Sequence, residues 1–305
     1  GDVYKRQPPS FSDFEYQAAS VSSGSSNSGQ SSSNSQSQLI KREHQISRIN
    51  GETLNLHAHA VLKDDGSVVA WGDRNTGGNI PNSIDFSQGG GVKEIFESGH
   101  AFATLQNDGS VLTWGNSGQG GNSSSVQHLL TNVKRIFSTS RAFAALKKDG
   151  SVVAWGTGHS GGNIPQNLTN KLNSGVVDVA VTQDAFAAVK DDGSVVTWGD
   201  STRGGDSSSV ANQLNSGVSK VYGNDNGFAA LKNDGSVVTW SEASWYSASL
   251  NAVRPYLNSD ISKVYASRGD FAAIKNDGSI ISWGNGASSS GLVIKDLQTL
   301  GSPVK

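Results

Sequence analysis

Short runs of β-forming and small residues alternate with tight-turn signals along most of the chain. The first clear run covers residues 59–63, is followed by Asp-Gly at 65–66, and continues with a second run at 68–72. Glycine adopts a positive φ at little cost, so Asp-Gly between two apolar runs predicts a β-hairpin. Both faces of these strands carry apolar or small side chains, which predicts that both faces are buried.

The same hairpin phrase recurs six times at a nearly constant period. The copies cover residues 59–72, 102–115, 143–156, 186–199, 228–241 and 271–284. Their tryptophans, which we expect to be structural, are Trp71, Trp114, Trp155, Trp198, Trp240 and Trp283. Their turn glycines are Gly66, Gly109, Gly150, Gly193, Gly235 and Gly278. A repeat of 41 to 43 residues predicts stacked supersecondary units.

A further short strand precedes five of the hairpins. These strands are predicted at residues 92–96, 133–137, 177–181, 218–222 and 261–265. Each unit has room for a fourth strand and matches one blade of a β-propeller, and no segment shows sustained helical periodicity. We therefore predict an all-β propeller of six complete four-stranded repeats. Residues 300–305 resemble the start of a seventh repeat, so the repeats form either a strained six-bladed ring or an open arc of a truncated seven-bladed propeller.

A glycine pair follows four of the tryptophans by six residues and predicts a bulge or a close backbone approach. The pairs are Gly77-Gly78, Gly120-Gly121, Gly161-Gly162 and Gly204-Gly205. In the fifth unit Trp245 and Tyr246 stand near this position. With Arg254 and Tyr256 they give one connector the composition of a partner-binding hot spot. The alternative is that these aromatic residues fill the space left by the missing glycine pair.

The repeats resemble those of the regulator of chromosome condensation family, in the short-period form found in a bacterial β-lactamase-inhibitor propeller. The likeness is carried by Ala-Phe-Ala-Ala-Leu-Lys-Lys-Asp-Gly-Ser-Val-Val-Ala-Trp-Gly at 142–156 and its five equivalents. It implies a propeller, commonly seven-bladed, that binds other proteins through its loops. Exchange factors for small GTPases and enzyme inhibitors are among the activities that it implies, but no GTPase-contacting residue can be carried over. Uninterrupted, nearly identical copies also resemble arrays in large bacterial surface or secreted proteins.

The two ends of the chain differ from the repeats. Residues 1–7 resemble the translation of a transposon-type sequencing adapter and are left out of the fold prediction. Residues 8–38 are rich in Ser, Gln and Asn and predict a disordered linker. The propeller domain is expected over residues 39–305, truncated at its C-terminus. The absence of methionine from the 305 residues agrees with a fragment.

Composition excludes several classes of function. The chain has 24 Lys+Arg against 26 Asp+Glu, and this balance argues against a nucleic-acid or anionic-membrane surface. The absence of cysteine excludes disulfides, thiol catalysis and cysteine-ligated metals. No apolar run approaches the roughly 18 residues of a membrane-spanning helix, so no membrane insertion is expected.

Two motifs could suggest chemistry, and the repeat explains both. Residues 158–162 match the G-x-S-x-G nucleophile elbow, which needs a histidine later in the chain, yet His159 is the last histidine. His57, His59 and His100 could suggest a metal site, but His59 takes the place of the repeat phenylalanine, which favours a packing role. We predict no catalytic residue, no metal and no cofactor.

These observations predict a non-enzymatic β-propeller scaffold that binds a protein or surface ligand through variable loops. We expect it to be a fragment of a larger bacterial secreted or surface protein and to lie outside the cell. The alternative is a regulatory partner in the cytoplasm, either a small-GTPase exchange factor or an enzyme inhibitor. An open arc would leave blade faces and strand edges exposed, so we also expect self-association.

Overall fold

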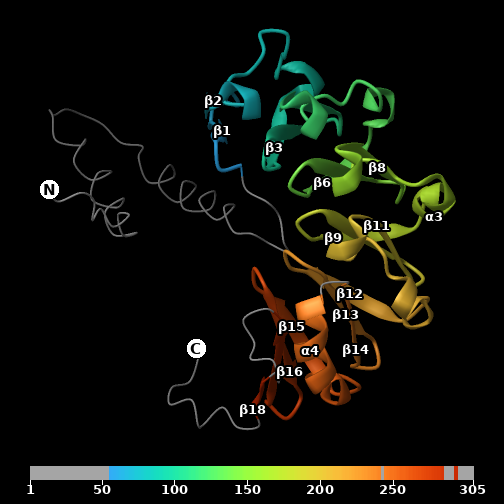
Figure 1. Ribbon diagram of the computed structural model, residues 1–305. Helices are drawn as coiled ribbons and strands as arrows, with labels where there is room; N and C mark the ends of the chain where they lie inside the picture. The colour runs from blue at the N-terminus through green and yellow to red at the C-terminus, as the bar shows by residue number, and fades with distance from the viewer. Residues whose placement is uncertain (1–54, 242–243, 285–291, 295–305) are drawn as a thin grey trace, which may run out of the picture. The chain divides into compact units, whose positions relative to one another are not determined.

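The computed structural model describes residues 55–241, 244–284 and 292–294. All of the described residues belong to one compact unit, Arg48–Lys305. In this unit the strands form six separate antiparallel sheets that follow one another in chain order (Figure 1). The predicted all-β propeller repeat is confirmed. The expected linker and the start of a seventh repeat lie outside the described residues.

We name the six sheets blades one to six. Their strands are β1 (Ala58–Leu62) and β2 (Val68–Gly72); β3 (Val92–Glu97), β4 (Ala101–Gln106) and β5 (Val111–Gly115); β6 (Val133–Ser138), β7 (Ala142–Lys147) and β8 (Val152–Gly156); β9 (Val176–Val181), β10 (Ala185–Lys190) and β11 (Val195–Gly199); β12 (Val218–Gly223), β13 (Phe228–Lys232) and β14 (Val237–Trp240); and β15 (Ile261–Ala266), β16 (Asp270–Lys275), β17 (Ile280–Gly284) and β18 (Leu292–Ile294). The first strands of successive blades, from β3 to β15, contact one another along the inside of the array.

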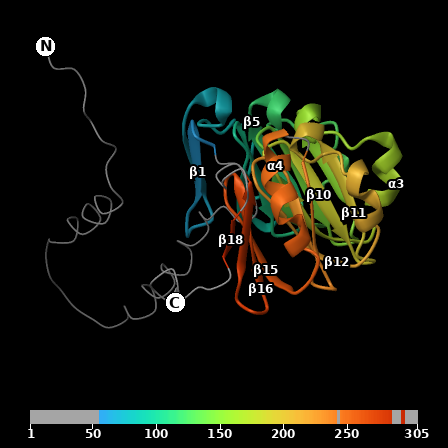
Figure 2. The same ribbon diagram turned by 60° about the horizontal axis from the view of Figure 1, so that its bottom comes forward.

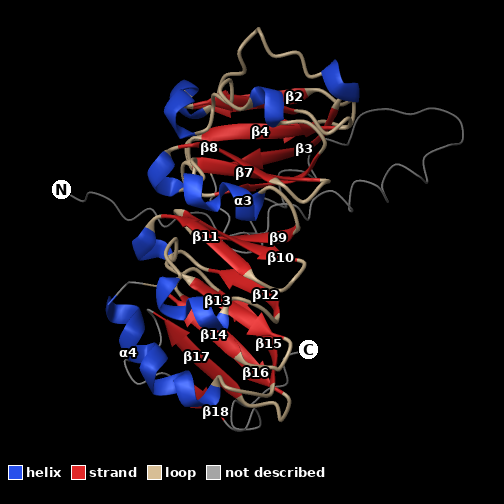
Figure 3. Ribbon diagram, turned by 90° about the vertical axis from the view of Figure 1, so that its right-hand side faces the viewer, coloured by secondary structure: helices blue, strands red, loops and turns tan. Residues whose placement is uncertain are grey.

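The fourth strand that the repeat length predicts is found in blade six alone among the described sheets, where β18 pairs with β17. In blades two to four, short helical turns follow the Trp strand, and most connectors are 3-10 turns joined by irregular chain (Figure 3). The helical segments are η1 (Arg74–Thr76), η2 (Gln88–Gly90), η3 (Ser117–Gln119), η4 (Gln127–Leu129), η5 (Gly158–Ser160), η6 (Gln166–Leu168), α3 (Thr169–Leu172), η7 (Ser201–Arg203), η8 (Ser208–Gln213), α4 (Ser244–Val253) and η9 (Arg254–Tyr256). The expectation of four strands per blade is corrected for blades two to five. The connectors of blades two to four are rich in Ser, Gly and Asn, which disfavour strands, and the connector of blade five forms the helix α4 instead.

The Asp-Gly hairpins form as predicted. In the first, Gly66 N donates to Lys63 O at 2.9 Å, and Lys63 N donates to Ser67 O at 2.9 Å. This is a tight turn closed by a glycine bulge, and φ lies between +75° and +86° at all six turn glycines. The carboxylate of Asp65 accepts hydrogen bonds from the hydroxyl and the N–H of Ser67, which lower its pKa. The other five turns repeat this Asp–Ser pair.

Each blade presents one small face and one aromatic face to its neighbours. In blade three, Ala142 and Ala144 pack toward blade four, whereas Phe143 and Trp155 pack toward blade two. Successive side chains of a strand point to opposite faces, so a single Ala-Phe-Ala sequence supplies both surfaces. The Phe and Trp rings of blades two to six stack with centroids 5.0 to 5.5 Å apart. The alanines therefore leave room for the ring pair of the next blade.

The rings of each blade pack against the glycine pair of the preceding blade. Trp155 Nε1 donates to Gly120 O of the preceding blade at 3.0 Å. Gly120 has a φ of +103°, and a Cβ there would lie 2.6 Å from the Phe143 ring. The same bond joins three other neighbouring blades, with the partners Trp114 and Gly77, Trp198 and Gly161, and Trp240 and Gly204. The predicted close approach is therefore an aromatic–glycine lock between consecutive blades.

The connector of blade five departs from this pattern, and the sequence did not predict how. A ten-residue helix, α4 (Ser244–Val253), stands where the glycine pair lies elsewhere. Its residue Leu250 is buried in one cluster with Trp283 of blade six. The hydroxyl of Ser249 is 3.1 Å from both N and O of Gly284. Figure 2 shows α4 lying against blade six, so a helix takes over the contact that a glycine turn makes in the other blades.

The aromatic face of blade one is exposed. Trp71 is 51% exposed, and its neighbours Val61 and Val69 are 46% and 42% exposed. The other five repeat tryptophans are buried. The expectation of two buried faces is thus wrong for blade one, because no alanine face of another blade covers this sheet among the described residues.

The lock predicts that Gly120→Ala destabilises the fold by at least about 2 kcal/mol, because alanine is strained at positive φ and its Cβ would meet the Phe143 ring. Gly118→Ala, two residues away, is the matched control. A Cβ there meets its nearest atom at 3.7 Å, and we expect a change below about 1 kcal/mol. Urea unfolding followed by circular dichroism measures both. Equal midpoints for the two variants would contradict the lock.

The exposed face of blade one predicts that self-association depends on Trp71. Trp71→Lys should shift the protein toward the monomer in light scattering coupled to size-exclusion chromatography, because a charge is not tolerated in an apolar interface. Leu129→Lys, a change at another exposed apolar residue, should leave the distribution unchanged. A wild type that stays monomeric at high concentration would refute the expectation of self-association.

Candidate functional site

The turns between the first and second strands of blades two to six are joined by a chain of backbone hydrogen bonds. Gly99 N donates to Ser140 O at 2.9 Å, and Ser140 N donates to Gln183 O at 2.7 Å. Gln183 N then donates to Asp225 O at 3.4 Å, and Asp225 N donates to Arg268 O at 3.0 Å. Each bond crosses from one blade to the next. The backbone at this end of the blades is therefore held in place whatever side chains the turns carry.

A polar cavity of about 490 Å³ lies among these turns, and we name it the turn pocket. Blades one to four contribute to it through the turns that precede β1, β4, β7 and β10, and blades three and four also contribute through the 3-10 turns after their Trp strands. Its ionisable lining residues are His57, His100, Arg141, His159, Asp184, Asp200 and Arg203. Segments far apart in the sequence thus meet at one site.

The two carboxylates of the turn pocket are already satisfied by the protein. Asp184 Oδ1 accepts hydrogen bonds from the hydroxyls of Ser140 and Ser160, the latter at 2.7 Å. Asp200 Oδ2 lies 2.8 Å from His159 Nε2. Both carboxylates therefore have partners within the chain that fix their positions in the cavity.

The cations of the turn pocket differ in their partners. Arg203 Nη1 donates to Asp225 O at 3.0 Å and to Asn226 Oδ1 at 2.7 Å. Arg141 is exposed, and within the described ranges no carboxylate pairs with its guanidinium. Its guanidinium is therefore available to an external anion, whereas that of Arg203 is held by neutral acceptors of the chain.

Two histidines lie beside Arg141. The rings of His57 and His100 stack with centroids 6.2 Å apart. Burial lowers the pKa of His100, and the nearby charges of Arg141 and His57 lower it further, while Asp73 opposes them. A neutral imidazole can donate one hydrogen bond and accept another, so the pocket offers a fixed cation beside adaptable polar rings.

The structure also bears on the motifs that suggested catalysis or metal binding. Ser160 is 1% exposed on η5, and its hydroxyl donates to a carboxylate rather than to a histidine. His59 packs its ring against Trp71 at 5.4 Å, as the repeat phenylalanines do with their tryptophans. Over residues 55–241 and 244–284, no group of three or more His, Asp or Glu side chains could hold a metal. None of the described helices is long and apolar enough to cross a membrane.

The predicted hot-spot connector lies apart from the lining of the turn pocket. Arg254 and Tyr256 belong to η9 and are exposed, with Tyr256 44% exposed. Trp245 and Tyr246 lie on α4, and their side chains fall outside the described part of the structure. Partner binding by these four residues stays a prediction. Sequence reasoning missed the turn pocket because its side chains lie in the turns whose sequence differs most between repeats. The regular spacing of those turns was the one signal that could have indicated it.

Comparison with known proteins gives similarity of structure alone. No protein-family model matches the chain. No curated protein matches it either. Prp20p from Saccharomyces cerevisiae, a yeast RCC1, is similar with a TM-score of 0.46 and 14% identity over 81% of this chain and 77% of that chain. Human WBSCR16 is similar with a TM-score of 0.45 and 17% identity over 75% of this chain and 74% of that chain. The CRINKLY WD40 ectodomain of the Arabidopsis thaliana receptor kinase ACR4 has a TM-score of 0.43 and 16% identity, covering 75% of this chain and 77% of that chain.

The yeast RCC1 belongs to the family that the repeats resemble. Since all three TM-scores are below 0.5, the propeller architecture rests on the repeats, the sheets and the aromatic–glycine locks of this chain.

The turn pocket predicts a coupling between Arg141 and His100. Arg141→Ala should raise the pKa of His100, because a neighbouring cation disfavours the imidazolium form. Titration of the imidazole resonances by NMR measures the shift. Lys148→Ala, at the other end of the same strand, should leave it unchanged.

The lowered pKa of His100 also has a consequence for stability. The unfolded chain takes up this proton near the ordinary value of 6.5 while the folded chain does not, so His100 contributes a loss of stability as pH falls through that value. Arg141→Ala should reduce this acid-side loss. A His100 pKa that is unchanged or lower in Arg141→Ala would contradict the coupling.

Proposed function

We propose that the chain is a non-enzymatic propeller scaffold that binds a partner protein at the turn pocket. The partner would place an acidic side chain against Arg141. One observation carries the proposal: in a cavity whose carboxylates are already hydrogen-bonded within the chain, Arg141 has no described carboxylate partner. A guanidinium binds carboxylates with two parallel hydrogen bonds and is a frequent anchor in protein interfaces.

The geometry around Arg141 favours a macromolecular partner over a small substrate. The cavity is open and polar, and side chains of four blades reach it from a backbone held by hydrogen bonds between blades. Rigid scaffolds with variable loop side chains are typical of binding surfaces. We further propose, from the Ser, Gly and Asn-rich connectors and the near-identical repeats, that the chain functions outside the cell as part of a larger bacterial secreted or surface protein.

The second candidate function is a regulatory partner of the kind that the repeat resemblance implies. An exchange factor would bind a small GTPase and speed nucleotide release, and an inhibitor would block one enzyme such as a β-lactamase. Either would act through a single stoichiometric partner. The exposed Arg254 and Tyr256 offer a second surface on which such a partner could bind.

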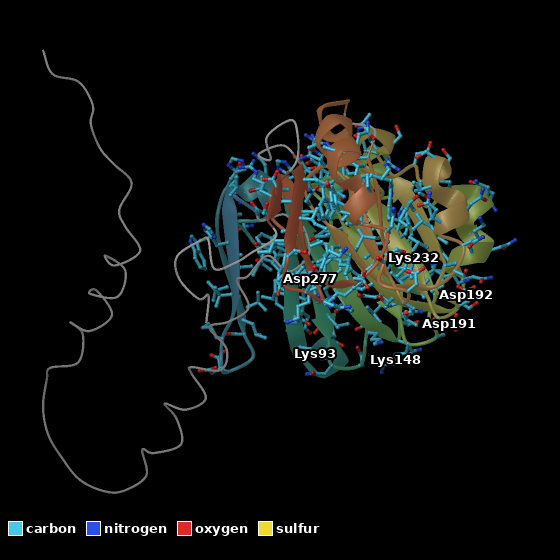
Figure 4. The ribbon with its side chains drawn as sticks, turned by 90° about the horizontal axis from the view of Figure 1, so that it is seen from below. Lys93, Lys148, Asp191, Asp192, Lys232 and Asp277 are labelled. Carbon is cyan, nitrogen blue, oxygen red and sulfur yellow. The ribbon has the colours of Figure 1, made fainter. Side chains whose placement is uncertain are left out.

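Charge reversal at the two ends of strand β7 tests the proposal. Arg141 precedes β7 and lines the turn pocket. Lys148, which is labelled in Figure 4, follows β7 at the hairpin end. Immobilised wild type, Arg141→Glu and Lys148→Glu would be used to capture proteins from culture medium and from cell lysate, followed by quantitative mass spectrometry. We expect at least one partner whose yield falls more than about tenfold with Arg141→Glu and stays within about twofold with Lys148→Glu.

Each other outcome of this capture is informative. Partners lost equally with both variants, or with neither, would refute the turn pocket as the binding site. A single GTPase or β-lactamase captured in stoichiometric amount would favour the regulatory function. Turnover of a substrate that survives repurification and is lost with Arg141→Glu would show that the pocket serves an enzyme rather than a scaffold.

A further inference from the structure

The outer edge of strand β11 in blade four directs backbone groups away from its sheet. Lys190 N donates to Ser194 O and Asp200 N donates to Asp184 O, each at 2.9 Å, at the two ends of the β10–β11 pair. In an antiparallel pair the residues that bond across the pair alternate with residues that do not. Val195, Thr197 and Gly199 therefore point their N–H and C=O groups outward, while Val196 and Trp198 bond to β10.

This outward edge is only partly used by the chain. Val195 N donates to Leu214 O of the following connector at 2.9 Å. The side-chain hydroxyl of Thr197 bonds to the hydroxyl of Ser207 at 3.0 Å. Within the described residues, the backbone N–H and C=O of Thr197 have no partner at this edge.

A groove of about 660 Å³ lies along the same edge, and we name it the edge groove. Both Val195 and Val196 line it, although their side chains point to opposite faces of the sheet. A cavity that touches both must lie over the edge of the strand rather than over one face. Leu168 of the preceding connector and Leu214 of the following one form apolar parts of its walls.

In blade six a fourth strand is paired with the equivalent edge. There β18 pairs antiparallel with β17, with Ile294 opposite Ile280 and Leu292 opposite Ser282. By the repeat, Ile280 and Ser282 correspond to Val195 and Thr197 of β11. The same chain thus contains both the edge with its fourth strand in place and the edge without one.

We propose that the edge groove binds an extended aliphatic segment of a partner protein, which adds to β11 as a fourth strand. The aliphatic character of the occupant follows from β18, whose sequence is Leu-Val-Ile, and from the apolar residues Leu168, Val196 and Leu214 among the polar ones in the groove walls. Its backbone would bond to Thr197, and alternate side chains would enter the groove. The turn pocket is lined by a different set of residues, so this proposal does not depend on the function proposed for that pocket.

A fluorescent peptide with the sequence of residues 290–296 is the probe, used with the full chain. In β18 the N–H of the Leu292 position faces the strand edge, and that of the Val293 position faces away. N-methylation at the leucine position should therefore weaken binding more than about tenfold, and N-methylation at the following valine should change it by less than about twofold. Fluorescence anisotropy measures both without altering the protein.

Two protein variants locate the binding site. Ala211 lines the edge groove and is exposed, so Ala211→Trp fills the groove without disturbing the core and should also weaken binding more than about tenfold. Asn212→Trp changes the next exposed residue of η8 and should have little effect. Loss of binding with Ala211→Trp and with the N-methylated leucine peptide, but not with their controls, supports the proposal.

The remaining outcomes of these binding measurements would overturn the proposal that the edge groove binds an added strand. No saturable binding to the wild type would show that the edge groove does not accept a strand. Binding that survives N-methylation at the leucine would show that the backbone does not carry the interaction. Binding that survives Ala211→Trp would place the peptide elsewhere, for example on β17 in exchange for β18.

Discussion

The contact between the Phe–Trp ring pair of one blade and the glycine turn of the blade before it is the constraint on which the rest of the structure depends. The Trp155 indole is buried and needs an acceptor, which is the carbonyl of Gly120. A buried indole N–H without a partner would cost about 1–3 kcal/mol, and any Cβ at Gly120 would displace the ring. Both the six-residue spacing from tryptophan to glycine and the distance between blades are therefore held nearly constant.

That constraint leaves other parts of each blade free to vary. The locks use residues inside the sheets and the glycine turns, whereas the turns from Gly99 to Arg268 are joined to one another through backbone atoms. A side chain in those turns can change without loss of these backbone hydrogen bonds, although Ser140 with Asp184 and Arg268 with Asp225 also join neighbouring blades through side chains. Arg141 and His100 can thus serve recognition, because neither takes part in the locks or in the chain of backbone bonds. A rigid backbone with variable side chains is the basis of many binding surfaces.

The hairpins, the first strands and the close approach at the glycine pairs could be predicted because each depends on local sequence repeated at one period. The helix α4 could not, since its apolar residue Leu250 is defined by contact with blade six rather than by its own periodicity. The exposure of Trp71 could not be predicted either. It arises because, among the described residues, no alanine face of another blade packs against blade one. The turn pocket was missed for a related reason: it is assembled from four blades, and no single repeat contains enough of it to form a recognisable motif.

The blades also differ in how they protect their outer edges, and this difference limits where a strand could be added. In blade two Gln127 Nε2 donates to Val111 O at 2.9 Å. Blades four and five instead share one contact, since Val195 N donates to Leu214 O at 2.9 Å and Val237 N donates to Leu257 O at 2.8 Å. Blade six is covered by β18, and unpaired edges are generally liable to aggregation. In blade four a groove of about 660 Å³ lies along the edge, with residues of the flanking connectors in its walls. Such an edge can select an extended segment.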